Sequence, residues 1–286
     1  MIGIVAASHY LQPVDTDAGL PSLEAELKEL CREPFRRIDR FIQLALLGSG
    51  RCVAGQDLQP DCGLYLGSGL GPIGNNVVTQ QQLIRDREIP KPFNFINTLG
   101  SSAGFYVARN LDLHGQNLFV SRRGASLEAV LNLAIADLSL GIVSQALVGV
   151  VEEVVPPLAV HRQRQQLSAT QALVEGSHWL LLQSDRPARR RIQLHRFDGF
   201  DQLEEWLASA WNSGDCLCCA TGMERSKADT LKQRFSGRIV SDWDGAFHNS
   251  LEAAWLTEFA TGDEPGNLFV VNGNAVRGWV LFHLGP

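Results

Sequence analysis

The sequence lacks the features that would mark a membrane or a secreted protein. No apolar run approaches the roughly 20 residues that a helix needs to cross a bilayer. The amino terminus, MIGIVAASHYLQP, has no basic segment ahead of its apolar stretch, which is typical of a first β-strand rather than of a signal peptide. We therefore expect a cytoplasmic protein without a membrane span.

Excess positive charge is also missing. The chain carries 25 lysines and arginines against 31 acidic residues, which gives a formal net charge of -6. General nucleic-acid binders usually carry excess basic residues to neutralise phosphates. The charge balance therefore argues against a nucleic-acid partner and leaves only local basic clusters as candidate contacts.

The sequence offers no metal-ligand spacing. The seven histidines form no HxxxH or HExxH pair, and the six cysteines are scattered apart from the run CLCC, residues 216–219. A zinc site needs paired CxxC or histidine partners, whereas adjacent cysteines in an apolar stretch are usually buried as small hydrophobic residues. We expect neither a metal nor a cofactor.

Strand-like and helix-like segments alternate along the chain. This alternation favours an α/β fold, with a parallel or mixed sheet covered by helices. The basic stretch LQSDRPARRR, residues 182–191, comes nearest to a boundary and also fits a solvated connection between strands. The expected strands are residues 2–7, 62–69, 117–120, 145–153, 172–185, 189–200, 215–223, 267–274 and 277–284, and the expected helices are 20–31, 35–54, 73–84, 101–113, 126–141, 203–211 and 250–262.

One glycine-rich loop has the spacing of a dinucleotide-binding motif. In GLYLGSGLGPIG, residues 63–74, the three glycines from Gly69 to Gly74 follow the GxGxxG pattern between a strand and a helix. Asp86 or Glu88 would then bind the ribose. The loop does not follow the first strand, however, Pro72 removes a backbone N–H, and no strand precedes either acid. Nucleotide binding is therefore the disfavoured alternative.

The segment NLFVSRRGASLEAVLNLAIADLSLG, residues 117–141, predicts a strand-turn-helix elbow. An apolar strand stops at two arginines and a glycine, and a helix with apolar residues at helical spacing follows. Many enzymes place a nucleophile at such an elbow. The apex here is Gly124, which has no side chain to react, and Ser126 lies two residues beyond it, where we expect it to cap the helix.

From this elbow outward, the sequence resembles the β-ketoacyl synthase family of thiolase-fold condensing enzymes. HGQNLFVS, GASLEA and QALVGVVEE match, in order and at the right distances, the family's segments around its nucleophile and the strand after the long helix. FRRIDRFIQLAL is similar to the family's arginine-rich helix, and ALVEGSHWLLLQSD to its "GEGAAALVLE" strand. The resemblance implies a thiolase-like fold of two related α/β halves with layered helices and mixed sheets, here residues 1–186 with the elbow and a reduced half, 187–286, as one inseparable unit.

The departures from the family pattern fall on its catalytic residues. The family uses a cysteine thiolate at the elbow, and the matched position here is Gly124. The first family histidine is replaced by Cys219 or Ala220, and the second by Asp242 or Trp243, although a shift of register would bring His248 near. The closing segment NLFVVNGNAVRGWVLFHL has also lost the family's glycine pair, which puts the oxyanion support in doubt.

The resemblance therefore implies a subunit without catalytic residues, of the chain-length-factor type. Such a subunit forms a heterodimer with an active ketosynthase and helps to shape the acyl tunnel in a type II fatty acid or polyketide system, with an aryl polyene pathway as our specific expectation. A buried arginine at the elbow would need an acid or a carbonyl, so we expect Arg122 or Arg123 to bond to the partner. The residues placed near the partner or tunnel are Phe93, Phe95, Asn97, Ser101, Phe105, Phe119, Ser121, Arg122 and Arg123.

Two alternatives remain open. The chain could be a scaffold that binds acyl carrier protein without condensing anything, because carrier proteins are acidic and Arg186, Arg189, Arg190 and Arg191 form a basic segment. It could also be an enzyme that uses His248 or Ser126 for hydrolysis or decarboxylation.

Overall fold

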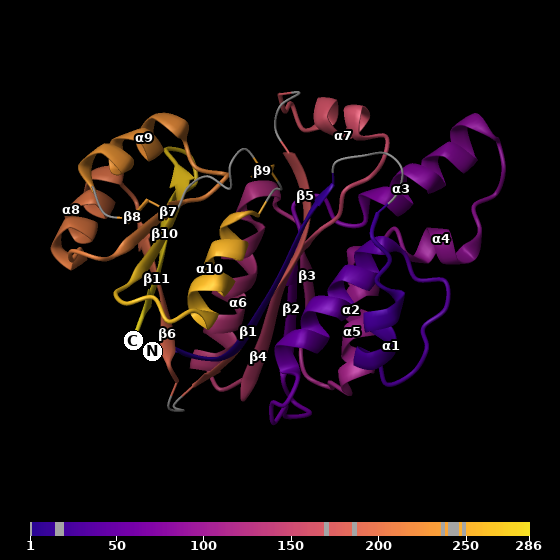
Figure 1. Cartoon of the computed structure of the whole chain (residues 1–286), viewed down its shortest axis with the longest axis horizontal. Coiled ribbons are helices and arrows are strands. Elements are labelled where there is room, and N and C mark those ends of the chain that lie inside the picture. The colour runs from indigo at the N-terminus through magenta and orange to yellow at the C-terminus, as the bar shows by residue number, and fades with distance from the viewer. Residues whose placement is uncertain are drawn as a thin grey trace.

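The computed structural model describes residues 2–14, 20–168, 172–184, 188–235, 238–239, 246–247 and 250–286. Within these residues the chain forms an 11-stranded mixed sheet flanked by helices (Figure 1). No helix in these ranges has the length and apolar character that crossing a membrane requires.

The first five strands lie side by side in the order β3-β2-β4-β5-β1. The strands β2, β3 and β4 are parallel, and β5 runs antiparallel to both β4 and β1. Every residue of β2 and β4 is buried, which is the pattern expected of parallel strands covered on both faces. The bounds are β1 Ile2–Val14, β2 Gly63–Gly67, β3 Asn117–Val120, β4 Gln145–Glu152 and β5 Ala172–Ser184.

The later strands repeat this arrangement. Their order is β8-β7-β10-β11-β6, with β7, β8 and β10 parallel and β11 antiparallel to both β10 and β6. The two groups join where β1 pairs with β6. The chain therefore contains two related α/β halves, as expected. The bounds are β6 Arg190–Phe197, β7 Cys216–Cys219, β8 Arg238–Ile239, β10 Leu268–Asn274 and β11 Gly278–Gly285, while β9 Ala246–Phe247 pairs with β5.

The helices form three layers around the two groups of strands. In Figure 1, α6 and α10 lie between the groups, α1, α2 and α5 cover the outer face of the first, and α8 and α9 cover the second. Three buried apolar clusters fill the spaces between these layers. The bounds are α1 Glu24–Leu30, α2 Arg40–Val53, α5 Gly100–Leu111, α6 Ser126–Ser139, α8 Phe200–Ala210, α9 Arg225–Arg234 and α10 Glu252–Thr261.

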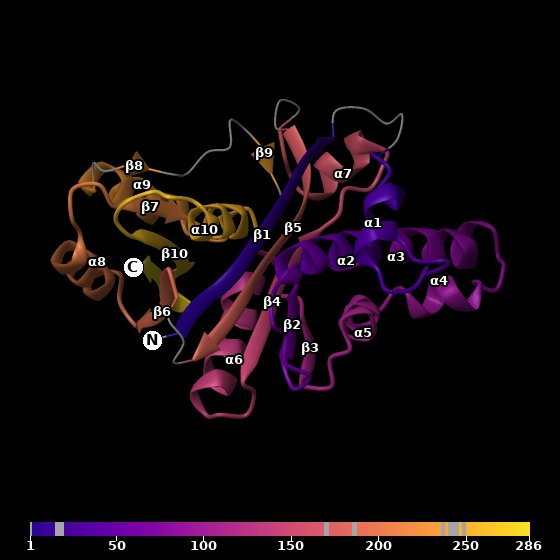
Figure 2. The same ribbon diagram turned by 60° about the horizontal axis from the view of Figure 1, so that its bottom comes forward.

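A group of short helices projects from the first half. In Figures 1 and 2, the segment from α3 to α4 extends away from the strands at the right of both views. This segment consists of α3 Ile73–Gln80, a π-helical turn η1 Gln81–Arg85 and α4 Pro92–Ile96. The helix α7 Leu158–Arg164 follows β4, and the 3-10 turn η2 Arg123–Ala125 precedes α6.

The expected alternation of strands and helices is confirmed, with differences at particular ends. The helix expected from Phe35 begins at Arg40, because Asp39 caps it by accepting a hydrogen bond from the Ile42 N–H at 2.9 Å. The helices α4, α7 and α9 were not expected. The helix α9, RSKADTLKQR, buries only Ala228 and Leu231, too few apolar residues to give a periodic pattern.

Candidate functional site

The elbow between β3 and α6 is present and tightly held. Arg123 takes a φ of 50°, in the left-handed region that side chains rarely adopt, so the chain turns sharply before the helix. The Ser126 hydroxyl is fully buried and accepts a hydrogen bond from the Arg122 N–H at 2.9 Å. The Ser126 hydroxyl in turn donates a hydrogen bond to the carbonyl oxygen of Ser68 or of Arg123. Ser126 therefore ties the elbow to the end of β2, and the expectation that it caps the N–H groups of α6 is wrong.

The apex of the elbow is closed by backbone from the second half of the chain. A Cβ atom added at Gly124 would lie 2.9 Å from the Gly222 Cα, and one added at Gly222 would lie 2.3 Å from the Gly124 carbonyl oxygen. The Asn272 side-chain amide donates to that carbonyl at 2.6 Å. A side chain at position 124, which the resemblance aligns with the family's nucleophile, would therefore collide with the loop after β7.

Ala220, expected near the first lost histidine position, lies on this same loop. It is buried, and its N–H donates to the Val271 carbonyl at 2.8 Å. Trp243 and Asp242, expected at the second position, lie outside the described residues, as does His248. The structure thus brings Gly124 and the first histidine segment together at one place.

Two glutamates, half-buried Glu128 and buried Glu252, lie beside this closed apex, and the sequence reasoning missed both. Burial raises the pKa of Glu128 to about 7, and burial together with repulsion from Glu128 raises the pKa of Glu252 to about 8. The Glu252 carboxylate accepts hydrogen bonds from the N–H and hydroxyl of Thr221, at 3.3 and 3.2 Å. One oxygen of each glutamate, Oε2 of Glu128 and Oε1 of Glu252, is buried without a hydrogen-bond partner. Perturbed carboxyls of this kind often indicate functional sites.

The glycine-rich loop after β2 is held by carboxylates. The Gly69 N–H donates to Glu152, and the Gly74 N–H donates to Glu153 at 2.7 Å. Burial raises the pKa of Glu152 to about 7 and that of Glu153 to about 8. Asp86 pairs with its neighbour Arg85. Two N–H groups that a pyrophosphate would need are thus already used, so the dinucleotide alternative has no support here.

Two of the motifs behind the family resemblance meet in a buried ion pair. Arg40, from FRRIDRF, donates from Nε to Oε2 of Glu175 at 3.0 Å and also contacts the other carboxylate oxygen. Glu175 is completely buried, and the Arg40 side chain is 13% exposed. These contacts fix the start of α2 against β5.

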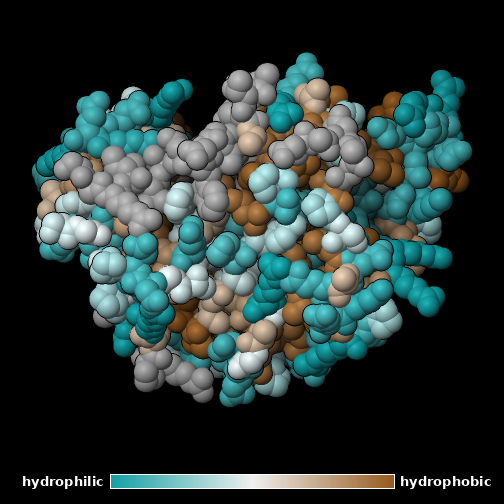
Figure 3. Space-filling view, in the orientation of Figure 1, coloured by the Kyte–Doolittle hydropathy of each residue, from teal (hydrophilic) through white to brown (hydrophobic). Residues whose placement is uncertain are grey.

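Exposed apolar side chains follow one another along the projecting segment and α5. Figure 3 shows brown side chains at the right-hand end of the molecule, where α3 and α4 lie in Figure 1. Next to α5, β3 pairs only with β2, so its outer edge has no partner strand in the described part of the chain. A large exposed apolar patch and an open strand edge both favour association with another chain. The exposed members, named the apolar face below, are Leu83, Ile84, Ile89, Phe93, Phe95, Ile96, Leu99 and Phe105.

The residues expected near a partner do not all reach the surface. Asn97 is 4% exposed, and its amide donates to the Arg37 carbonyl at 3.2 Å. The Phe119 side chain is half-buried, and its ring packs against Phe41 and Gly100 of its own chain. Asn97 therefore lies below the surface of the isolated chain, and Phe119 reaches that surface only in part. Phe93, Phe95, Ser101, Phe105, Ser121, Arg122 and Arg123 are exposed.

The arginines of the basic segment also differ in whether their side chains are exposed or buried. Arg190 is 6% exposed, donates to the carbonyls of Gly266 and Glu264, and lies over the Phe259 ring, so it braces the loop before β10. Arg190 is thus unavailable for a carrier protein. Arg189 pairs with Asp263, and both side chains are largely exposed. Arg186 lies outside the described residues.

The cysteines of β7 are buried or half-buried, as the sequence predicted, and they form no disulfide within the described residues. Burial raises the pKa of Cys219 to about 11, so its thiol stays protonated at neutral pH. No cluster of three metal-ligating side chains occurs among the residues that the structure describes.

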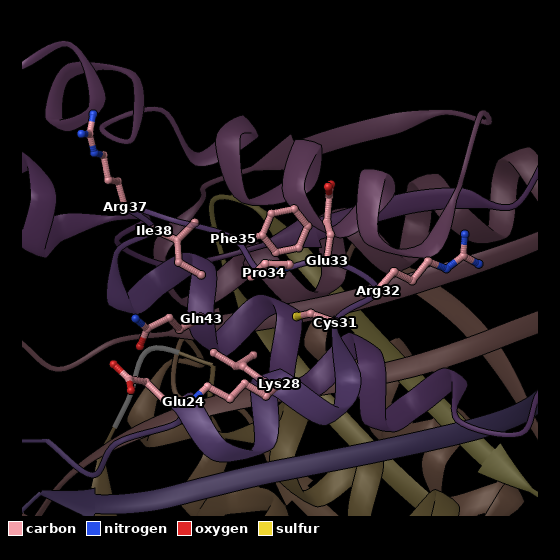
Figure 4. Close-up of a pocket in the computed structure, with 11 residues that line it drawn as sticks. Glu24, Lys28, Cys31, Arg32, Glu33, Pro34, Phe35, Arg37, Ile38 and Gln43 are labelled. Carbon is pink, nitrogen blue, oxygen red and sulfur yellow. The ribbon is translucent and has the colours of Figure 1, made fainter.

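A groove of about 580 Å³ lies beside α1 and the loop that leads to α2 (Figure 4). Figure 4 shows Cys31 and Phe35 along its wall, with Arg32 and Arg37 at opposite ends. Some of the charges at its rim are engaged elsewhere. Glu33 pairs with Arg109 at 2.6 Å, and the Arg37 guanidinium lies 4.9 Å from the centre of the Phe93 ring. The groove therefore offers a ligand fewer free charges than its lining contains.

Residues 12–175, more than half of the chain, match the family model of the β-ketoacyl synthase N-terminal domain. No curated protein sequence matches the chain significantly.

Solved structures resemble the chain over most of its length. A chain of the ishigamide ketosynthase/chain length factor has a TM-score of 0.72 and 17% identity, covering 99% of this chain and 98% of its own. A chain of AntDE:AntF, a type II PKS acyl-carrier protein in complex with its ketosynthase bound to the hexaketide, has a TM-score of 0.67, 10% identity and 99% coverage of both chains. The ketosynthase ApeO in complex with its chain length factor ApeC, from Xenorhabdus doucetiae, gives a TM-score of 0.54 and 12% identity, covering 96% and 85%. At such identities these matches show a shared thiolase-like fold.

Proposed function

The chain belongs to the β-ketoacyl synthase family, and on this premise we propose that it is a non-catalytic subunit of the chain-length-factor type. It pairs with an active β-ketoacyl-acyl-carrier-protein synthase and shapes the tunnel that holds the growing acyl chain. The system it serves is a type II fatty acid or polyketide pathway, with an aryl polyene pathway as the specific candidate.

The closed apex of the elbow carries this proposal. Gly124 occupies the position of the family's nucleophile, and Gly222 lies so close that no side chain fits there. The Asn272 amide, from the closing hairpin, fixes the same contact. A site that had merely lost its cysteine would keep space for one, whereas this site is filled by packed backbone.

The apolar face and the open edge of β3 support a partner chain. Phe95, Ile96 and Leu99 are each more than half exposed, which is costly for a chain that stays alone in water. Similarity of fold to chains from ketosynthase/chain length factor complexes agrees with a partner of the same family. The residues proposed at this contact are Phe93, Phe95, Ser101, Phe105, Ser121, Arg122 and Arg123.

The arginines of the elbow give the first test. We expect the double variant Arg122→Ala, Arg123→Ala to lose most of its co-purification with the ketosynthase of the same gene cluster, because interface arginines contribute disproportionately to binding. The variant Arg164→Ala, Arg225→Ala removes the same charge from two exposed positions on other helices and should bind normally. Undiminished co-purification of the elbow variant would contradict the arginine contact.

A scaffold that binds acyl carrier protein is the second candidate, supported by exposed Arg189 near half-buried Arg191. It predicts that the chain alone binds carrier protein and that Arg189→Ala, Arg191→Ala weakens this binding. A catalytic role through Ser126 is disfavoured because its hydroxyl is fully buried. Turnover of acyl thioesters by the isolated chain would restore the enzyme alternative.

A further inference from the structure

A cavity of about 320 Å³ lies next to the closed elbow, and the functions above assign no ligand to it. The first two turns of α6 form one wall, and the turn between β10 and β11 forms the other. Six polar side chains line it: Arg122, Glu128, Asn132, Arg196, Asn272 and Arg277.

The three arginines come from three separate elements and converge on this cavity. Arg122 belongs to the elbow, Arg196 to β6 and Arg277 to the β10–β11 turn. In the described part of the chain, none of them forms an ion pair with a carboxylate. Arg277 donates to the Gly222 carbonyl at 3.0 Å, which uses one of its five N–H groups. Most of the guanidinium donors around the cavity are thus free.

Glu128 is the acidic residue among those that line the cavity. Its Oε2 atom is buried without a hydrogen-bond partner. The charged and polar groups acting on it are Arg122 and Arg277, which favour its ionised form, Asn272, which donates to it, and Glu252, which opposes its ionisation. A protonated Glu128 can donate a hydrogen bond to an acidic ligand, whereas an ionised one repels such a ligand.

We propose that this cavity binds an oxyanion, the carboxylate or phosphate group of a small molecule, through Arg122, Arg196 and Arg277. Guanidinium groups match the planar edges of carboxylate and phosphate oxygens and are the preferred side chains for binding them. The first turn of α6 adds the positive end of a 14-residue helix. The site requires no partner chain and does not rest on the proposed function. Arg123, which does not line the cavity, remains available for the subunit contact.

Sulfate is a suitable probe because it stays a dianion across neutral pH. Titration calorimetry of the isolated full chain at constant ionic strength should give saturable binding of one sulfate. The variant Arg196→Ala, Arg277→Ala should bind at least tenfold more weakly, since each charged hydrogen bond contributes roughly a factor of ten. The exposed pair Arg164→Ala, Arg225→Ala controls for lost charge. No saturable binding, or equal loss in the two pairs, would overturn the proposal. Titrations with methyl phosphate and with acetate then distinguish a phosphate ligand from a carboxylate ligand. The probe that binds more tightly identifies the group that the cavity prefers.

The pH dependence tests the role of Glu128 separately. Burial raises its pKa to about 7, so its negative charge develops as the pH rises from 6 to 8. Wild-type affinity for sulfate should fall at least severalfold over this interval, and Glu128→Gln should hold its affinity and exceed wild type at pH 8. If the affinity of Glu128→Gln falls as steeply as that of wild type, Glu128 does not face the anion. Circular dichroism of every variant confirms that the comparison is made between folded chains.

Discussion

Single residues carry the proposal that this chain has no condensing activity. Gly124 offers no nucleophilic side chain, and the Gly222 Cα, which would lie 2.9 Å from any Cβ at position 124, leaves no space for one. Asn272 then anchors the closed contact through the Gly124 carbonyl. The sequence alone predicted the missing side chain, since a single position decides it. The closure could not be predicted, because it joins residues about one hundred positions apart.

Restoring the cysteine should therefore not restore the enzyme. We expect Gly124→Cys to lower the free energy of unfolding by about 1–3 kcal/mol, since the side chain overpacks against Gly222. The variant should also remain unacylated by a short acyl thioester, as measured by mass spectrometry. Gly199→Cys is a control with open surroundings, where the nearest atom to the new Cβ is 3.9 Å away. Rapid acylation of Gly124→Cys would show that the apex is open.

We expect the buried Arg40–Glu175 ion pair to contribute strongly to the free energy of unfolding. Replacing Arg40 by Met leaves Glu175 completely buried without its counter-charge, which should cost about 3–5 kcal/mol. Arg51→Ala breaks the half-exposed pair with Glu26 and should cost less than about 1 kcal/mol. Urea unfolding of the two variants measures both values. Equal losses of unfolding free energy in the two variants would mean that the buried pair stabilises the fold no more than the half-exposed pair does.

Glu153 should make the protein less stable as the pH rises. Burial raises its folded pKa to about 8, above the unfolded value of about 4.5, so the folded chain holds its proton more tightly. The contribution of this group to stability is therefore fully present below pH 4.5 and is lost as the pH rises to 8, by at most about 1.4 kcal/mol per pH unit. Glu153→Gln should gain stability relative to wild type between pH 5.5 and 7.5. Unfolding curves of exposed Glu205→Gln should parallel those of wild type, and parallel curves for Glu153→Gln would refute the assignment.

At the scale of elements, the elbow forms a closed site, and the projecting helices form an exposed apolar surface. Strand and helix positions were largely predictable because apolar residues alternate or recur at helical spacing, as in the fully buried β4 and in α2. The burial of Asn97 and Arg190 was not predictable. Each is polar, and only its tertiary contacts with Arg37 or with Gly266 explain its place inside.

The apolar face should be needed for association and not for folding. Phe95→Asp combined with Ile96→Asp places two charges on side chains that are 62% and 51% exposed, so the free energy of unfolding of the isolated chain should change by less than about 1 kcal/mol. Co-purification with the cognate ketosynthase should fall at least tenfold. Val276→Asp, on a side chain that is 95% exposed at the β10–β11 turn, is the matched control. Normal complex formation by the double variant would place the interface elsewhere.

At the scale of the whole molecule, the repeated strand order explains how the fold forms independently of the residues at the elbow. Both halves arrange five strands in the same order and directions, and α6 and α10 lie between them in one shared core. We propose that the halves meet near residue 186, between β5 and β6. This framework depends on buried apolar strands and not on the residues of the elbow, and we therefore propose that the fold and a surface for a partner persist without the family's chemistry.

The most direct test is to co-express this chain with the ketosynthase of its gene cluster and determine the mass and activity of the product. We expect one heterodimer, seen by native mass spectrometry, that condenses acyl-carrier-protein substrates, while the isolated chain neither forms an acyl-enzyme nor turns over acyl thioesters. Two separate species after co-expression, or thioester turnover by this chain alone, would contradict the proposed function.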